Sequence, residues 1–329
     1  MKKGILLLPL ALTLVSAYAQ QDPMFTKYIF NSLVFNPAYA GSREHLSMTA
    51  IYRQQWTGLE GSPVTQSITA HSPLHKQRAA VGFSLLNDQA GAVGTTTINA
   101  SYAYRFPLGD HFKLAIGLQG GVSNWRGNWS KLTLENPNDI AFQNSLNRWL
   151  PNVGAGLYLS STTFYAGLGV PAILEYDLRK AGTDDHAVFS KNYRHYYTTI
   201  GAAIPLGSES IVLRPSVLLK STGLFSTFRS DAAFRNVGSP TELDLDISVF
   251  FFQTLWLGTA FRSALELRNS SADSADLWAA WQLRNGLRLG AAYDFPVSRI
   301  RNSTSGSFEL LLGYDFDRKV KNVVTPRYF

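Results

Sequence analysis

The 329-residue sequence contains no cysteine. This absence excludes disulfide bonds, thiolate metal sites, cysteine nucleophiles and a lipid anchor on an N-terminal cysteine. The histidines form no H-x-x-H or H-E-x-x-H array, so the sequence offers no metal motif and no cofactor is predicted. The six histidines are His45, His71, His75, His111, His186 and His195.

Long apolar runs are also scarce, and the longest lies in the first nineteen residues. Lys2 and Lys3 precede an apolar run over residues 4–15, and Ala17-Tyr18-Ala19 is a small-residue cleavage site. The run is shorter than the ~20 residues that a helix needs to cross a bilayer. We therefore predict a signal peptide over 1–19 and a mature chain from Gln20. No later run could span a membrane as a helix, so any membrane crossing must use strands.

Charge of one sign is nowhere concentrated. Without the two lysines of the signal peptide, 28 basic side chains face 23 acidic ones, a net charge of +5. The basic residues are scattered, and no nucleic-acid-binding motif accompanies them. The sequence therefore predicts no nucleic-acid partner.

What the chain has in abundance is period-2 alternation of apolar and polar residues, which is typical of strands with two different environments. Residues 95–106 show it clearly, and residues 241–251 and 307–316 repeat it. In the first of these, one face carries Ile98, Ala100, Tyr102, Tyr104 and Phe106, and the other carries Thr97, Asn99, Ser101, Ala103 and Arg105. A polar face opposite an uninterrupted apolar face predicts water on one side and lipid on the other.

The alternation predicts about fourteen strands of roughly nine to eleven residues, the length of a tilted transmembrane strand. Because unpaired strand edges are costly in hydrocarbon, the sheet is expected to close into an all-β, antiparallel transmembrane barrel. The predicted strands are 44–54, 63–72, 79–88, 95–106, 112–123, 152–160, 162–170, 194–204, 211–221, 242–252, 255–263, 276–284, 287–294 and 306–316.

The connections give a second signal. Those after even-numbered strands are short, whereas several after odd-numbered strands are long, notably 124–151, 171–193 and 222–241. Outer-membrane barrels have short periplasmic turns and long outer loops. The sequence therefore predicts an outer-membrane barrel of Gram-negative bacteria with both termini in the periplasm, and a soluble all-β fold is the less favoured alternative.

The polar faces carry charges of both signs, which favours salt-bridge networks inside the barrel over an ion-selective ring. A structural polar core and a substrate channel both remain open as interpretations. The predicted inward charged residues are Arg53, Arg105, Lys113, Arg214, Lys220, Asp244, Asp246, Arg262, Asp276, Arg284, Arg288, Asp294, Glu309 and Asp315.

The segment 20–43 precedes the first strand. Asp22 and Pro23 suit the start of a helix, and Asn36-Pro37 is expected to end it. We therefore predict a short amphipathic helix that lies at the periplasmic rim, enters the lumen as a plug, or forms part of a partner surface. The candidate plug or partner-binding residues, from this segment and the end of the first strand, are Phe25, Tyr28, Phe30, Phe35, Tyr39, Arg53 and Trp56.

Several stretches of the chain resemble the PorP/SprF family of type IX secretion membrane proteins. The strongest similarity lies in the first fifty-odd mature residues, and weaker similarity continues to the C-terminus. The similar stretches are Gln21-Asp22-Pro23, Tyr28 and Phe30, Asn36-Pro37-Ala38-Tyr39-Ala40-Gly41, Tyr52-Arg53-Gln54-Gln55-Trp56, 63–73, 151–156, 164–168, 305–310 and 326–329.

The resemblance implies an outer-membrane barrel needed for export or surface attachment of proteins by the type IX system. The implied partners are the periplasmic ring and lipoprotein components of that machine, or secreted proteins such as adhesins that carry its C-terminal sorting domain, together with outer-membrane lipid. The expected organisation is signal peptide 1–19, N-terminal periplasmic or plug segment 20–43, barrel 44–316 and periplasmic tail 317–329.

No catalytic arrangement is predicted. His71 and Ser72 are neighbours on one strand, so their side chains point to opposite faces and cannot easily pair. Glycines such as those of Gly117-Leu118-Gln119-Gly120-Gly121 lie on a strand and are expected to make room for a neighbour or a bend rather than to bind phosphate. The alternative function is an outer-membrane transporter or porin for small hydrophobic or polar solutes.

Overall fold

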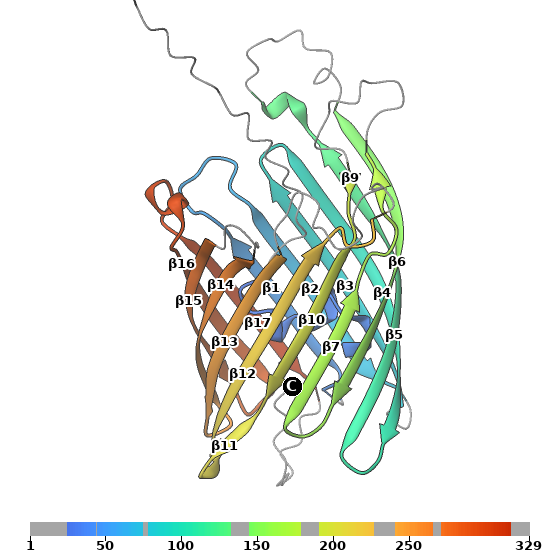
Figure 1. Cartoon of the computed structure of the whole chain (residues 1–329), viewed down its shortest axis with the longest axis vertical. Coiled ribbons are helices and arrows are strands. Elements are labelled where there is room, and N and C mark those ends of the chain that lie inside the picture. The colour runs from blue at the N-terminus through green and yellow to red at the C-terminus, as the bar shows by residue number, and fades with distance from the viewer. Residues whose placement is uncertain are drawn as a thin grey trace, which may run out of the picture.

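The computed structural model describes residues 25–43, 45–74, 78–132, 145–178, 191–226, 241–265 and 271–316. Fourteen antiparallel strands form a closed barrel (Figure 1). They are β1 (Ser47–Gln54), β2 (Val64–Pro73), β3 (Ala79–Ala90), β4 (Val93–Leu108), β5 (Phe112–Gly127), β6 (Leu146–Ser160), β7 (Phe164–Val170), β10 (His195–Ala202), β12 (Ser208–Thr222), β13 (Thr241–Phe251), β14 (Leu255–Leu265), β15 (Ser271–Gln282), β16 (Leu287–Pro296) and β17 (Ser307–Asp315).

Two pairings close the ring. The first strand pairs with the last, so that Ser47 lies opposite Asp315 and Gln54 opposite Phe308. On the far side, β10 pairs with β12. The short strand β11 (Ile204–Leu206) extends the turn between them, and β8 (Tyr176–Asp177) pairs with β9 (Lys191–Asn192) in a separate two-stranded sheet. The predicted closed barrel of fourteen strands is confirmed.

The two faces of the strands differ as the alternation predicts. The outward face is apolar and exposed, with Leu118 at 62%, Leu277 at 59% and Ile247 at 55%. On the inward face of β13, Asp244 and Asp246 are only 5% and 2% exposed. A wide exposed apolar surface around a polar, buried interior is the inverse of a soluble protein and matches a barrel surrounded by lipid.

The strand ends differ from the prediction on one side of the barrel. The strands β4, β5 and β6 have 16, 16 and 15 residues, and with β3 they rise beyond the other strands at the end that carries the long connections (Figure 1). The predicted loop 124–151 therefore shrinks to 128–145. The connection between β3 and β4, which follows an odd-numbered strand, is only residues 91–92. We call this end of the barrel the long-loop end, and the opposite end the short-turn end.

The helix predicted near the N-terminus is wrong in type. The described part of this segment contains three single turns of 3-10 helix, η1 (Tyr28–Phe30), η2 (Ser32–Val34) and η3 (Pro37–Tyr39). Asn36-Pro37 begins η3 instead of ending a helix, because the Asn36 side chain accepts a hydrogen bond from the Ala38 amide and Pro37 occupies the first turn. A helix with one apolar face does not form because side chains around the whole segment are buried.

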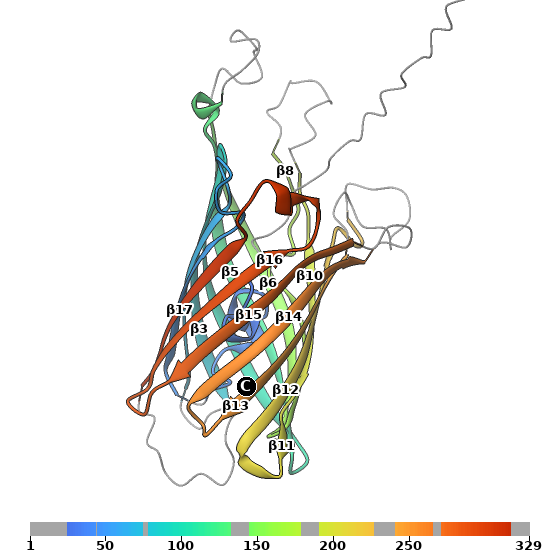
Figure 2. The same ribbon diagram turned by 90° about the vertical axis from the view of Figure 1, so that its left-hand side faces the viewer.

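Residues 25–43, which we call the lumen segment, lie inside the barrel (Figure 2). Their side chains form hydrogen bonds to strands on opposite sides of the ring, including Asn31 to Ser67 on β2 and Tyr28 to Ser216 on β12. Only a position within the ring allows contacts in all these directions. Among the described residues, no helix is long and apolar enough to cross a membrane.

Candidate functional site: the filled barrel interior

The lumen segment runs from the long-loop half of the barrel to its short-turn end. The carbonyl oxygen of Phe25 accepts a hydrogen bond of 3.2 Å from Arg262, near the long-loop end of β14. The amide of Gly41 donates a hydrogen bond of 3.0 Å to Nδ1 of His71, near the short-turn end of β2. The segment therefore runs lengthwise inside the barrel between these two levels.

One carboxylate holds the backbone at the start of the segment. Glu309 accepts hydrogen bonds from the amides of Thr26 at 2.7 Å and Lys27 at 3.0 Å. The hydroxyl of Thr26 donates to Asp294 at 2.9 Å, and the guanidinium of Arg53 contacts both Thr26 and Asp294, the latter at 2.7 Å. Arg53 and Glu309 are each 1% exposed. Charge-assisted hydrogen bonds between buried groups fix this end of the segment.

The ammonium group of Lys27 lies between two carboxylates of the wall. Its Nζ is 2.7 Å from Asp276 and 3.2 Å from Asp246. The same oxygen of Asp246 also accepts a hydrogen bond of 3.0 Å from the indole N–H of Trp278. Lys27 itself is 3% exposed. The lumen segment thus supplies a cation that contacts two carboxylates of the wall.

Other wall charges pair with one another. Arg262 forms a two-point contact with Asp244, with Nε to Oδ1 at 2.6 Å and Nη2 to Oδ2 at 3.0 Å. The Nζ of Lys220 is 3.7 Å from Glu242. Lys220, Glu242 and Asp244 line a small cavity together with Phe25.

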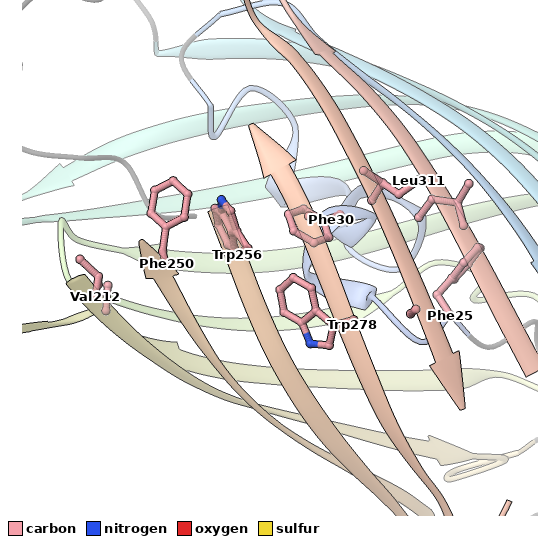
Figure 3. Packing of buried hydrophobic residues seen from close by; sticks show 11 residues of the cluster. Phe25, Phe30, Val212, Phe250, Trp256, Trp278 and Leu311 are labelled. Carbon is pink, nitrogen blue, oxygen red and sulfur yellow. The ribbon is translucent and has the colours of Figure 1, made fainter. Parts of the chain in front are cut away.

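An aromatic cluster fills the barrel between the lumen segment and strands β12 to β17 (Figure 3). The ring of Phe30 lies 5.3 Å from that of Trp256 and 5.6 Å from that of Trp278, measured between centroids. Phe250 lies 4.3 Å from Trp256. The guanidinium of Arg214 is 4.2 Å from the ring centroid of Trp256, within the range of a cation–π contact.

A second aromatic contact fixes the other side of the segment. Phe35 stacks on Tyr197 of β10 at 5.3 Å, and Tyr28 lies 6.4 Å from Phe35. The phenol of Tyr28 is 2.8 Å from the hydroxyl of Ser216. Burial raises the pKa of Tyr28 well above its usual value, so the phenol stays protonated and available for this hydrogen bond.

Glycines on β5, β6 and β7 make room for residues 35–38 of the lumen segment. A Cβ on Gly117 would lie 2.1 Å from the amide nitrogen of Ala38, and one on Gly169 would lie 2.1 Å from the carbonyl oxygen of Phe35. A Cβ on Gly156 would lie 2.1 Å from the side-chain oxygen of Asn36. Real side chains do not approach so closely, so these wall positions accept only glycine while the segment is in place.

The short-turn end of the segment has its own charged group. Asp315 accepts a hydrogen bond of 2.6 Å from Ser47 and lies 3.5 Å from Arg43 and 3.9 Å from Arg288. Arg105 donates to the carbonyl oxygen of Ala40. Tyr39, buried at this level, packs edge-on against His71 and Tyr158.

The structure thus brings most of the predicted site residues to one interior. Phe25, Tyr28, Phe30, Phe35 and Tyr39 are all buried in the lumen segment. The predicted inward charges that contact this segment directly, or that pair with charges that do, are Arg53, Arg105, Asp244, Asp246, Arg262, Asp276, Arg288, Asp294, Glu309 and Asp315.

Three predicted residues lie elsewhere. Lys113 is exposed near the short-turn end of β5. Arg284 is exposed in the turn after β15, which ends at Gln282 and not at residue 284, so its predicted inward position is wrong. Trp56 follows the end of β1, is half-buried with φ of 47°, and donates its backbone amide to Ser307 at 3.1 Å.

The sequence did not identify Lys27 as part of the site, nor the cradle glycines, which are Gly117, Gly156 and Gly169. The sequence does not show where the segment around Lys27 lies, and its partner Asp246 is 219 positions away. The glycine signal was present, since Gly117 was expected to make room for a neighbour, but its neighbour could not be named. The resemblance supplies a retrospective clue, because Asn36-Pro37-Ala38 meets Gly156 and Gly167, which lie in other similar stretches.

No group of three or more histidine, aspartate or glutamate side chains that could hold a metal ion is present in the described part of the chain. The buried carboxylates are instead matched by arginine, lysine and backbone amides. The arrangement is suited to holding a polypeptide segment in place inside the barrel.

Residues 17–314 match a family model described as the type IX secretion system membrane protein PorP/SprF. Solved structures with similar chains include BamA from Haemophilus ducreyi lacking POTRA domains 1–3, with 13% identity, coverage of 83% of this chain and 71% of that chain, and a TM-score of 0.43. A Pseudomonas aeruginosa FadL homologue has 12% identity, 83% and 89% coverage, and a TM-score of 0.44. Salmonella typhi OmpF in complex with daunomycin has 10% identity, 82% and 97% coverage, and a TM-score of 0.37. No curated protein matches the chain.

Proposed function

Because the chain belongs to the PorP/SprF family of type IX secretion system membrane proteins, we propose that it is a non-enzymatic outer-membrane component of protein export. It binds other parts of the secretion machine, a dedicated secreted protein, or both. The machine partners are the periplasmic ring and lipoprotein components, and the secreted partner carries a type IX C-terminal sorting domain. The observation that carries the proposal is the family match over residues 17–314 of a chain that forms a barrel.

The packed interior supports this role over that of a solute pore. A porin needs polar side chains that line a water-filled channel. Here Arg53, Arg288 and Glu309 are 1%, 0% and 1% exposed, because the lumen segment covers them. The surfaces that remain for partners are the two rims and the connections between strands.

The proposed orientation places the short turns in the periplasm and the long connections outside the cell, as in other outer-membrane barrels. β17 ends at the short-turn end, so the tail 317–329, which lies outside the described residues, follows from the periplasmic rim. Its basic residues make it a candidate contact for the periplasmic ring.

A deletion strain tests the proposed function. We expect loss of surface display or release of at least one protein with a type IX sorting domain, with uptake of small solutes unchanged. Complementation with the intact gene should restore export. Normal export together with impaired solute uptake would instead identify the protein as a transporter or porin.

Purification from membranes in mild detergent identifies the partner. Co-purification of ring and lipoprotein components alone would indicate a general part of the machine, whereas a large secreted adhesin would indicate a dedicated carrier. Recovery of neither class, under conditions that keep the rest of the machine intact, would contradict the proposal.

A further inference from the structure

We infer that the lumen segment is a permanent part of the barrel, and that an exported protein therefore does not pass through this lumen. The statement about the route rests on the proposed role in export, whereas the statement about the segment does not. The barrel would then act in secretion through its rims and connections.

The first argument is that the wall is shaped for the segment. The cradle glycines Gly117, Gly156 and Gly169 come from three adjacent strands, and each would place a Cβ 2.1 Å from an atom of residues 35–38. If the segment left, the wall would have no side chain of its own at these three positions on β5, β6 and β7. A barrel that worked with an empty lumen would not need three such positions in register.

The second argument is charge. The wall presents Glu309, Asp294, Asp246 and Asp276 toward the start of the segment, and their partners include the backbone amides of residues 26 and 27 and the ammonium group of Lys27. Removing the segment would leave Asp246 and Asp276 without the ammonium group that contacts both, and Glu309 without its two backbone donors, while Arg53 would still contact Asp294 and Glu309. Like charges at short range in a confined space repel strongly, so the empty state is disfavoured.

The third argument is that the contacts surround the segment. Asn31 donates to Ser67 on β2 at 3.0 Å, and the phenol of Tyr28 lies 2.8 Å from Ser216 on β12, on the opposite wall. Phe30 packs against Trp256 and Trp278 on strands between them. Ala38, on η3, is completely buried. A plug that is withdrawn during each transport cycle would have to break aromatic, ionic and hydrogen-bonded contacts on several walls at once.

An engineered disulfide tests the inference directly. A Cβ built on Gly82 of β3 lies 3.3 Å from the Cβ of Ala40, close to the spacing of about 3.5–4.5 Å found in disulfides. The chain has no natural cysteine, so Ala40→Cys with Gly82→Cys introduces the only thiol pair. The full-length variant replaces the wild type in cells, and the oxidised fraction is measured after thiol blocking.

We expect the locked protein to export the sorting-domain protein within about twofold of each single-cysteine variant. Thr49→Cys with Thr69→Cys, which are paired positions on β1 and β2, controls for a disulfide within the wall. Export that falls more than tenfold in the locked protein and recovers on reduction, while the control pair exports normally, would overturn the inference. If deletion of the gene leaves export intact, the proposed function is wrong. The position of the lumen segment is then tested by thiol labelling, which does not depend on export.

Thiol labelling in cells provides a readout that does not need export. Ala40 is completely buried, whereas Glu60 is exposed in the connection between β1 and β2. We expect a membrane-impermeant polyethylene-glycol maleimide to label Glu60→Cys rapidly and Ala40→Cys at least tenfold more slowly, during active export as well as at rest. Equal labelling rates for the two cysteines would show that the segment leaves the lumen. Rapid labelling of Ala40→Cys, combined with failure of the Ala40–Gly82 cysteine pair to oxidise, would show the same.

Discussion

Lys27 supplies the ammonium group that two wall carboxylates share. Its Nζ contacts Asp276 and Asp246 at 2.7 and 3.2 Å, and all three side chains are at most 7% exposed. Lys27→Met keeps the length of the side chain but leaves both carboxylates without their cation. We expect a loss of about 3–5 kcal/mol in the free energy of unfolding, the usual cost of breaking a buried ion pair.

Urea titration in detergent measures this change, with the folded fraction read from the mobility of unheated samples on a gel. Arg284→Met removes a positive charge from an exposed turn and is the matched control, expected to change stability by less than about 0.5 kcal/mol. Equal midpoints for Lys27→Met and the wild type would mean that Lys27 does not hold the wall carboxylates.

Gly117 and Gly120 provide a second comparison within one strand. A Cβ on Gly117 would lie 2.1 Å from the Ala38 amide, whereas one on Gly120 has no atom within 4 Å. Gly117→Ala is therefore expected to cost on the order of 1–3 kcal/mol or to reduce the folded yield, as overpacking does. Gly120→Ala should be close to neutral in the same urea titration. Equal effects would mean that the lumen segment does not press against β5.

At this scale the sequence predicts which residues face inward but not what they contact. Alternation places Glu309 on the polar side of its strand. Its partners, the amides of Thr26 and Lys27, are 283 and 282 positions away, and no local pattern encodes such a contact. Arg284 was placed on the inward face because the alternation was continued past Gln282, the last residue of β15. A turn residue has no such face.

Among the elements, the fourteen strands could be predicted because lipid and the packed lumen impose a different residue type on each face. The ends of β5 and β6 could not. Beyond the membrane the requirement for apolar outward residues disappears, and Trp125 and Leu150 are instead buried on the inner side against Leu178. The pattern there no longer distinguishes strand from loop.

The lumen segment illustrates a different failure. A helix was expected because Phe25, Tyr28 and Ile29 fit one face of a helical period. Burial of Lys27, Phe30 and Asn31 as well shows that the segment has no single buried face. Short 3-10 turns allow side chains to point to every wall, and only the surrounding barrel makes that arrangement favourable.

The depth of a residue along a strand should set the cost of charging its outward face. On β5, Leu118 lies near mid-strand and is 62% exposed, whereas Phe112 is the first residue. We expect Leu118→Arg to cost about 2–4 kcal/mol and Phe112→Arg about 0–1 kcal/mol, as for other membrane barrels. Unfolding in lipid vesicles measures both. A larger cost at Phe112 would place the hydrocarbon layer elsewhere on the barrel.

For the whole molecule, the direction of the lumen segment bears on the position of the N-terminus. Phe25 lies toward the long-loop end, and the predicted mature chain has five residues before it. Five residues reach at most about 17 Å, enough to approach the long-loop mouth. Both termini were expected in the periplasm, but this direction favours the cell surface for Gln20.

An epitope tag between Ala19 and Gln20 tests this prediction. We expect antibody to bind it on intact cells, whereas the same tag after Phe329 should react only after the outer membrane is permeabilised. If both tags react only after permeabilisation, the N-terminus lies in the periplasm and this prediction is wrong.

The pairing of β1 with β17, together with the hydrogen bond from the Thr26 amide to Glu309, joins the beginning and the end of the described chain. A prematurely terminated chain that lacks β17 would possess neither the partner of its first strand nor the acceptor for its leading residues. Such products would stay open and accessible to periplasmic proteases. Only a complete chain would close the barrel and resist these proteases. Finished molecules alone would then persist to take part in secretion.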